Sequence, residues 1–172
     1  MRVRYSLIPI LAVVLIVASA PSHATTTSYV ANLSGANEVP PNPSPATGTA
    51  FVVYDDVANT LSTSVTYSGL VATMTATHIH GPALAGTNAP VIHFLATTSP
   101  PLGTQSGSYS DVWDSSDSPA LNATHISYLT TQKLYINIHT GTYPGGEIRG
   151  QIVPAATPAR AVSWGRIKNL YR

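Results

Sequence analysis

The sequence predicts an all-β fold, a single Greek-key β-sandwich or barrel of about seven or eight strands with one short helix. Short runs of alternating apolar and polar residues recur along the chain, and Gly, Pro and Asn separate them. Alternation with a period of two is typical of strands, and these turn residues end them. Once a short N-terminal segment is set aside, the length suits one domain.

The candidate strands follow from this alternation. In residues 27–35, Tyr29, Ala31 and Leu33 lie on one face of an extended chain. Residues 49–56 and 60–70 are predicted to form a hairpin. The other predicted strands lie within residues 75–82, 89–96, 107–113, 133–140 and 146–154.

One segment departs from the strand pattern. Residues 118–134 place Leu121, Ile126 and Leu129 near helical spacing, behind Ser118-Pro119. Serine before proline is a common helix start, so we expect one short helix that begins there.

The two ends of the chain differ from its body. Residues 1–24 combine Arg2 and Arg4 with a short apolar run and small residues before a cleavage point, which predicts a signal peptide, although an uncleaved anchor is the alternative. The body, residues 25–154, would then be secreted, periplasmic or displayed at the cell surface, with no membrane span after cleavage.

Residues 155–172 form a basic linker and a short amphipathic C-terminal tail. Its apolar residues, at three- and four-residue steps between cations, are Trp164, Ile167, Leu170 and Tyr171. The tail is either a terminal helix packed on the domain or a docking segment.

Charge and cysteine content exclude several functions. Residues 25–159 hold two basic residues against seven acidic ones, which argues against nucleic-acid binding. With no cysteine, the chain has no thiol nucleophile, and soft-metal chemistry must use histidine or Met74. Serines are abundant, but none lies in a G-x-S-x-G elbow.

The histidines are the strongest candidate ligands. His78 and His80 are two residues apart, so on a strand their imidazoles project from one face. His139 ends another predicted strand, and three imidazoles from two strands would leave an open coordination position, most suited to copper. The alternative is that these histidines hydrogen-bond the loops at residues 81–90 and 140–146 and hold no metal.

Other polar residues are weaker candidates. His93 shares a face with Val91 and Leu95, which favours a core or edge histidine over a ligand, and His125 is expected at the surface. Glu147 and Arg149 alternate on one strand face. They form either an exposed ion pair of little energetic value or a buried pair that braces the histidine face; a further alternative is that Arg149 attracts an anion.

Two stretches resemble the CHRD domain family. They are residues 31–70 leading into "ATHIHGPALAGTNAPVIHFL", and "LYINIHTGTYPGGEIRGQIVP" at residues 134–154. The resemblance covers about residues 27–154 and implies a secreted β-sandwich. We expect this sandwich to be either immunoglobulin-like or superoxide-dismutase-like. The resemblance implies little about activity, and nothing here matches the cysteine-rich modules of chordin.

A more distant resemblance is to copper/zinc superoxide dismutases, in the order Gly69-Leu70, His78-x-His80, His139 and Arg149. It implies that the three histidines hold copper, that His93 bridges two metals and that Arg149 attracts an anion. The chain departs from those enzymes because it has no disulfide and no evident zinc-binding aspartate.

These observations favour a secreted, non-catalytic module for extracellular binding or surface assembly that carries a histidine copper site. Its partner would be an extracellular or cell-surface protein, or a second copy of the chain. The alternative is a copper-dependent dismutase.

Overall fold

The computed structural model describes residues 25–95 and 102–156. The predicted signal peptide and the tail residues Trp164, Ile167, Leu170 and Tyr171 lie outside the described residues. The described chain is mostly antiparallel β-structure with one short helix, which confirms the all-β prediction. In these two ranges, no helix is long and apolar enough to cross a bilayer.

The strands lie where the alternation predicts them. They are β1 (Thr26–Ser34), β2 (Thr47–Asp55), β3 (Thr60–Ser68), β4 (Met74–His80), β5 (Val91–Phe94), β6 (Gly107–Trp113), β7 (Tyr135–Thr140), β8 (Ile148–Gln151) and β9 (Val153–Pro154), with a 3-10 turn η1 (Gly35–Asn37) and the helix α1 (Ala123–Thr130).

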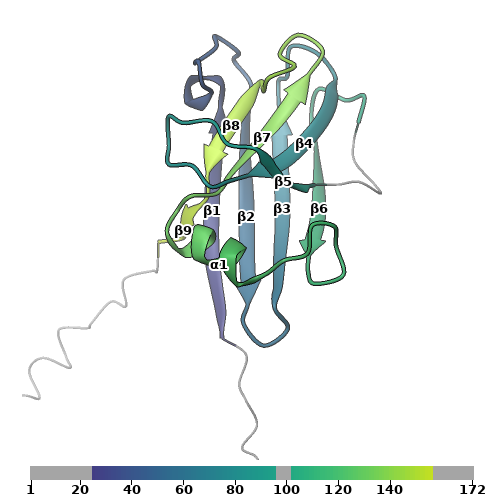
Figure 1. Cartoon of the computed structure of the whole chain (residues 1–172). Coiled ribbons are helices and arrows are strands. Elements are labelled where there is room, and N and C mark those ends of the chain that lie inside the picture. The colour runs from purple at the N-terminus through teal and green to yellow at the C-terminus, as the bar shows by residue number, and fades with distance from the viewer. Residues whose placement is uncertain (1–24, 96–101, 157–172) are drawn as a thin grey trace, which may run out of the picture.

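The strands form one curled sheet in the order β5-β4-β7-β8-β1-β2-β3-β6, with β9 beside β1. Because β3 pairs with β6 and β4 pairs with β7, the connectivity is of the Greek-key type. In Figure 1 the strands β1, β2, β3 and β6 form the rear layer, and β4, β5, β7 and β8 cross in front of it.

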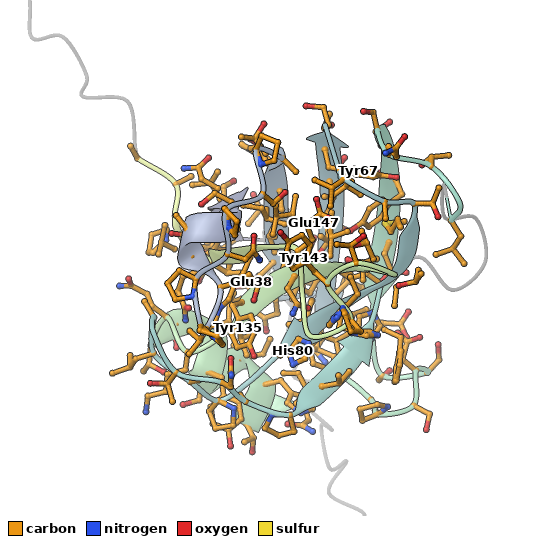
Figure 2. The ribbon with its side chains drawn as sticks, turned by 90° about the horizontal axis from the view of Figure 1, so that it is seen from above. Glu38, Tyr67, His80, Tyr135, Tyr143 and Glu147 are labelled. Carbon is orange, nitrogen blue, oxygen red and sulfur yellow. The ribbon has the colours of Figure 1, made fainter. Side chains whose placement is uncertain are left out.

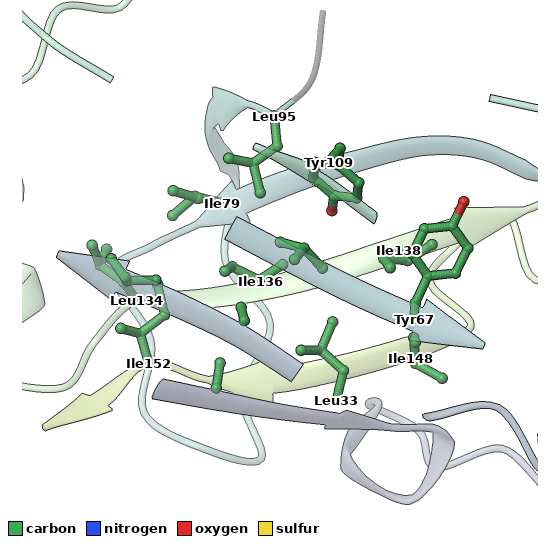
Figure 3. Packing of buried hydrophobic residues seen from close by; sticks show 14 of the residues in the cluster. Leu33, Tyr67, Ile79, Leu95, Tyr109, Leu134, Ile136, Ile138, Ile148 and Ile152 are labelled. Atoms are coloured by element: carbon green, nitrogen blue, oxygen red, sulfur yellow. The ribbon is translucent and has the colours of Figure 1, made fainter. Parts of the chain in front are cut away.

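The core lies between the two layers. On β1 the predicted face of Tyr29, Ala31 and Leu33 is buried, and Ile136 and Ile138 of β7 pack in the same cluster (Figure 3). Burying one such isoleucine contributes about 1.5–3 kcal/mol to the stability of the fold. Every residue of β7 is buried, including those that point away from the core. Loops therefore cover the outer face of this strand.

Side chains join β6 to the neighbouring strands β5 and β4. His93 Nε2 lies 2.7 Å from Asp111 Oδ2, and the hydroxyl oxygens of Thr77 and Tyr109 lie 2.6 Å apart. Among the strand pairs of the described chain, none joins β5 to β6.

The helix exists, but its predicted start at Ser118 is wrong. Asn122 is the N-cap, and its side chain accepts hydrogen bonds from the backbone N–H groups of Thr124 and His125, at 2.9 and 3.2 Å. An asparagine oxygen satisfies the free N–H groups of a first turn better than the Ser-Pro pair four residues earlier can.

Candidate metal centre

The candidate centre lies on the outer face of β4 and β7. Antiparallel pairing sets His78 opposite Asn137 and His80 opposite Tyr135, while His139 lies two residues beyond Asn137 on β7. Since alternate residues share a face, the three imidazoles project together and Ile79 points into the core. The predicted convergence of His78, His80 and His139 is therefore present.

The three rings are close enough to share one ion. One ligand atom from each imidazole lies within 4.8 Å of the other two. His78 Nδ1 is 3.0 Å from His139 Nε2, and the centroids of the His78 and His80 rings are 5.5 Å apart. His80 and His139 are buried, whereas His78 is half-buried and touches the ring of Phe94.

Backbone carbonyls fix two of the ring tautomers. His80 Nδ1 is 2.9 Å from the carbonyl of Ala89, and His139 Nδ1 is 3.0 Å from the carbonyl of Pro144. A carbonyl only accepts, so each Nδ1 carries the proton and each Nε2 keeps its lone pair. Metal-binding histidines in proteins are oriented by this kind of hydrogen bond.

Electrostatics keep the rings neutral. Burial, followed by the neighbouring His139 and His80, lowers the pKa of His78 to about 4. Burial also lowers the pKa of His80 and of His139, against the carbonyls of Ala89 and Pro144, which raise it. Neutral imidazoles are the form that binds a metal, so no proton needs to leave these rings at neutral pH.

A stack of side chains supports His80. The centroids of the His80 and Tyr135 rings are 4.8 Å apart, and the two ring planes make an angle of 5°. Arg149 Cζ lies 3.4 Å from the centre of the same tyrosine ring. The Arg149 guanidinium also donates to Thr87 O at 2.7 Å and to Asn88 Oδ1 at 3.1 Å. Arg149 therefore ties the loop at residues 81–90, which carries the carbonyl of Ala89, onto the site.

Glu147 and Arg149 are both buried, with exposed fractions of 0% and 1%, so the exposed ion pair is wrong. Their side chains also have separate partners. The Glu147 carboxylate accepts from the Ser44 hydroxyl at 2.7 Å, from the Val71 N–H at 2.8 Å and from the Thr140 hydroxyl at 2.7 Å. Glu147 therefore joins two loops to the end of β7, and Arg149 alone braces the histidine face.

The other candidate residues lie elsewhere. His93 faces the core side with Ile79, binds Asp111 and stacks on Trp113 at 4.7 Å. His125 is half-buried against Trp113 rather than fully at the surface. Neither joins the three clustered histidines, and Met74 is part of the hydrophobic core.

Sequence reasoning missed Glu38. It follows η1 in the proline-rich loop, yet only 6% of it is exposed. Burial, opposed by the positive charge of Arg149, raises the pKa of Glu38 to about 7. Figure 2 shows Glu38, Tyr135 and His80 in succession when the molecule is seen from above. No hydrophobic periodicity marks a single buried acid in a loop.

A comparison with known families gives one result. The model of the CHRD domain matches residues 29–152. No curated protein and no solved structure matches the chain significantly.

Proposed function

The chain belongs to the CHRD domain family, and we propose that it is an exported, non-catalytic β-sandwich module that binds copper through His78, His80 and His139. The observation that carries the proposal is the convergence of three neutral imidazoles from β4 and β7 within 4.8 Å. A module of this kind would act by binding an extracellular or cell-surface protein, or by self-assembly.

The donor set favours copper. Imidazole nitrogen suits both copper and zinc, and among divalent first-row metals copper binds a given nitrogen site most tightly. The Nε2 atoms of His80 and His139 supply two ligands. His78 supplies Nδ1 once its proton moves to the other ring nitrogen. Three protein ligands leave a coordination position for water or a partner group.

A two-metal dismutase is less well supported. The residue that would bridge the metals, His93, lies on the core side of β5 and is bound to Asp111. The proposed centre therefore holds one ion, and Arg149 braces it without needing an anion.

Metal titration tests the centre. Chelated, metal-free protein is titrated with copper(II) and zinc(II) by calorimetry, alongside His78→Ala, His80→Ala and His139→Ala. The matched control is His125→Ala, a half-buried histidine outside the cluster. We expect one equivalent of copper, at least tenfold weaker binding in the three cluster variants, and stabilisation of about 2.7 kcal/mol when free copper is 100 times Kd.

Equal affinity in wild type and His139→Ala would contradict the three-histidine centre. Superoxide turnover by the copper form, lost in the same variants, would replace the non-catalytic module with an enzyme.

Cell fractionation checks export, since retention of the whole chain in the cytoplasm contradicts it. Removal of residues 157–172 checks the tail, because a docking tail requires that its loss releases the protein into the medium.

A further inference from the structure

A chain of polar side chains leads from Glu38 to the histidine site. Glu38 Oε1 and Asn137 Nδ2 both lie beside Gly146. A Cβ atom added to this glycine would lie 2.8 Å from Asn137 Nδ2 and would also clash with Glu38 Oε1. The two side chains therefore approach the same point, Glu38 from the loop after η1 and Asn137 from β7. Asn137 lies two residues before His139 on β7, on the same face, and directly opposite His78 on β4. The Asn137 side chain also interacts with His80 and raises its pKa, against the lowering of that pKa by burial.

Three atoms of these polar side chains lack partners. In the part of the protein that is described, no hydrogen bond reaches Glu38 Oε1, Asn137 Oδ1 or His80 Nε2, although all three are buried. All three are acceptors when Glu38 is ionised and His80 carries its proton on Nδ1. A buried acceptor without a partner destabilises the fold, so a donor that satisfies any of these atoms is strongly favoured.

The amide of Asn137 has two orientations with different consequences. When Glu38 is ionised, Asn137 Nδ2 turns to the carboxylate and Oδ1 faces the histidines, which leaves the lone pair of His80 Nε2 free. When Glu38 is protonated, its hydroxyl donates to Asn137 Oδ1. The amide is then reversed, and Nδ2 donates to His80 Nε2, where it occupies the lone pair that a metal needs.

We propose that Glu38 and Asn137 form a proton-linked switch for the histidine site, in which ionised Glu38 frees His80 Nε2 for a cation and protonated Glu38 blocks it through the reversed Asn137 amide. Glu38 is thus a positioning residue that acts through Asn137. This proposal rests on the proposed copper function for its role and adds a control of the affinity.

Glu38 has a route for its proton and a suitable charge environment. It lines a hollow of about 370 Å³ with Arg149 and Gln151, and a second of about 310 Å³ with Tyr143. Arg149 of β8 is the charged group that acts on Glu38. Glu147, from the turn before β8, directs its carboxylate to Ser44, Val71 and Thr140 instead.

The remaining titratable side chains of β7 and β4 are Tyr135, His139, His78 and His80. Burial lowers the pKa of all three histidines. They therefore stay neutral where Glu38, with its pKa of about 7, changes charge.

Metal-free protein gives the first test. The 15N resonance of His80 Nε2 is followed by NMR from pH 5.5 to 8.5 in wild type, Glu38→Gln and Asn137→Ala. We expect a step near pH 7 in wild type that both variants lose, with Glu147→Gln as the matched buried control that keeps it. A step that persists in Glu38→Gln, or no step in wild type, overturns the switch.

Copper affinity gives the second test. From pH 6 to pH 8 we expect the copper affinity of wild type to rise roughly three- to tenfold more than that of Glu38→Gln, because ionised Glu38 frees the lone pair of His80 Nε2 through Asn137. When Asn137 is already replaced by alanine, the rise in copper affinity from pH 6 to pH 8 should differ by less than twofold between proteins with Glu38 and with Glu38→Gln. Copper binding with an equal pH profile in wild type and Glu38→Gln overturns the switch and leaves the proposed function intact. Absence of copper binding removes both.

Discussion

Replacing Glu38 by glutamine should stabilise the protein above neutral pH. In the unfolded chain this carboxyl ionises near its ordinary pKa of 4.5, and in the folded protein its pKa is about 7. A raised folded pKa means that the folded state holds the proton more tightly. The resulting stability is present below pH 4.5 and is lost as the pH rises to 7.

The size of the effect follows from the two values. The difference between 4.5 and about 7 corresponds to roughly 3 kcal/mol at full strength. The side chain keeps a small opening to solvent, so screening reduces this to about 1–2 kcal/mol. The amide that Glu38→Gln introduces also supplies a donor for the unpartnered Asn137 Oδ1. We expect Glu38→Gln to exceed wild type by about 1–2 kcal/mol at pH 8 and to equal it at pH 4.5.

Urea unfolding at several pH values measures this difference, with Glu147→Gln as the contrasting variant. Glu147 accepts three hydrogen bonds on two oxygens, so its loss should destabilise the protein by about 1.5–3 kcal/mol at pH 8. If Glu38→Gln is less stable than wild type at pH 8, the attraction between the Glu38 carboxylate and Arg149 outweighs the cost of burying that carboxylate. This result would refute the reasoning.

Two further predictions concern single backbone positions. Gly146→Ala should cost about 1–3 kcal/mol, because Gly146 has a φ of +133° and an added Cβ would collide with Glu38 and Asn137. An unchanged urea midpoint would show that this turn relaxes freely. Asn122→Ala should cost about 1 kcal/mol and Asn122→Gly only a few tenths, since the Asn122 side chain caps two N–H groups of α1. Thermal unfolding measures both, and equal costs for the two variants would contradict the cap.

Local pattern was sufficient to predict most of the fold. The alternation of Tyr29, Ala31 and Leu33 identified the buried face of β1, because a period of two has one physical meaning on a strand. The two-residue step from His78 to His80 placed both rings on one face for the same reason. The position of His139 at the end of a strand indicated the third candidate ligand, and the pairing of β4 with β7 brings it beside His78 and His80.

What the sequence could not predict depends on contacts between distant segments. Glu147 and Arg149 are both buried, and their partners, such as Val71 for Glu147 and Thr87 for Arg149, come from segments far away in the sequence. The burial of Glu38 arises because the proline-rich loop packs against β8, which no local pattern encodes. The helix was placed four residues early, because Ser118-Pro119 and Asn122 are both acceptable starts by composition.

At the junction of β5 and β6, the two layers meet without strand pairing in the described part of the chain. Within the strand pairs described, the backbone amides of β6 that point away from β3 have no ladder partner on β5. Side chains join the two layers instead, since the His93–Asp111 contact links β5 to β6 and the Thr77–Tyr109 contact links β4 to β6. Such a joint can open by rotation of a few side chains, while β1, β2 and β3 stay paired along nine-residue registers. Amide exchange should therefore be fastest along β5 and β6 and slowest in β2, which makes this junction the place where the two layers first part.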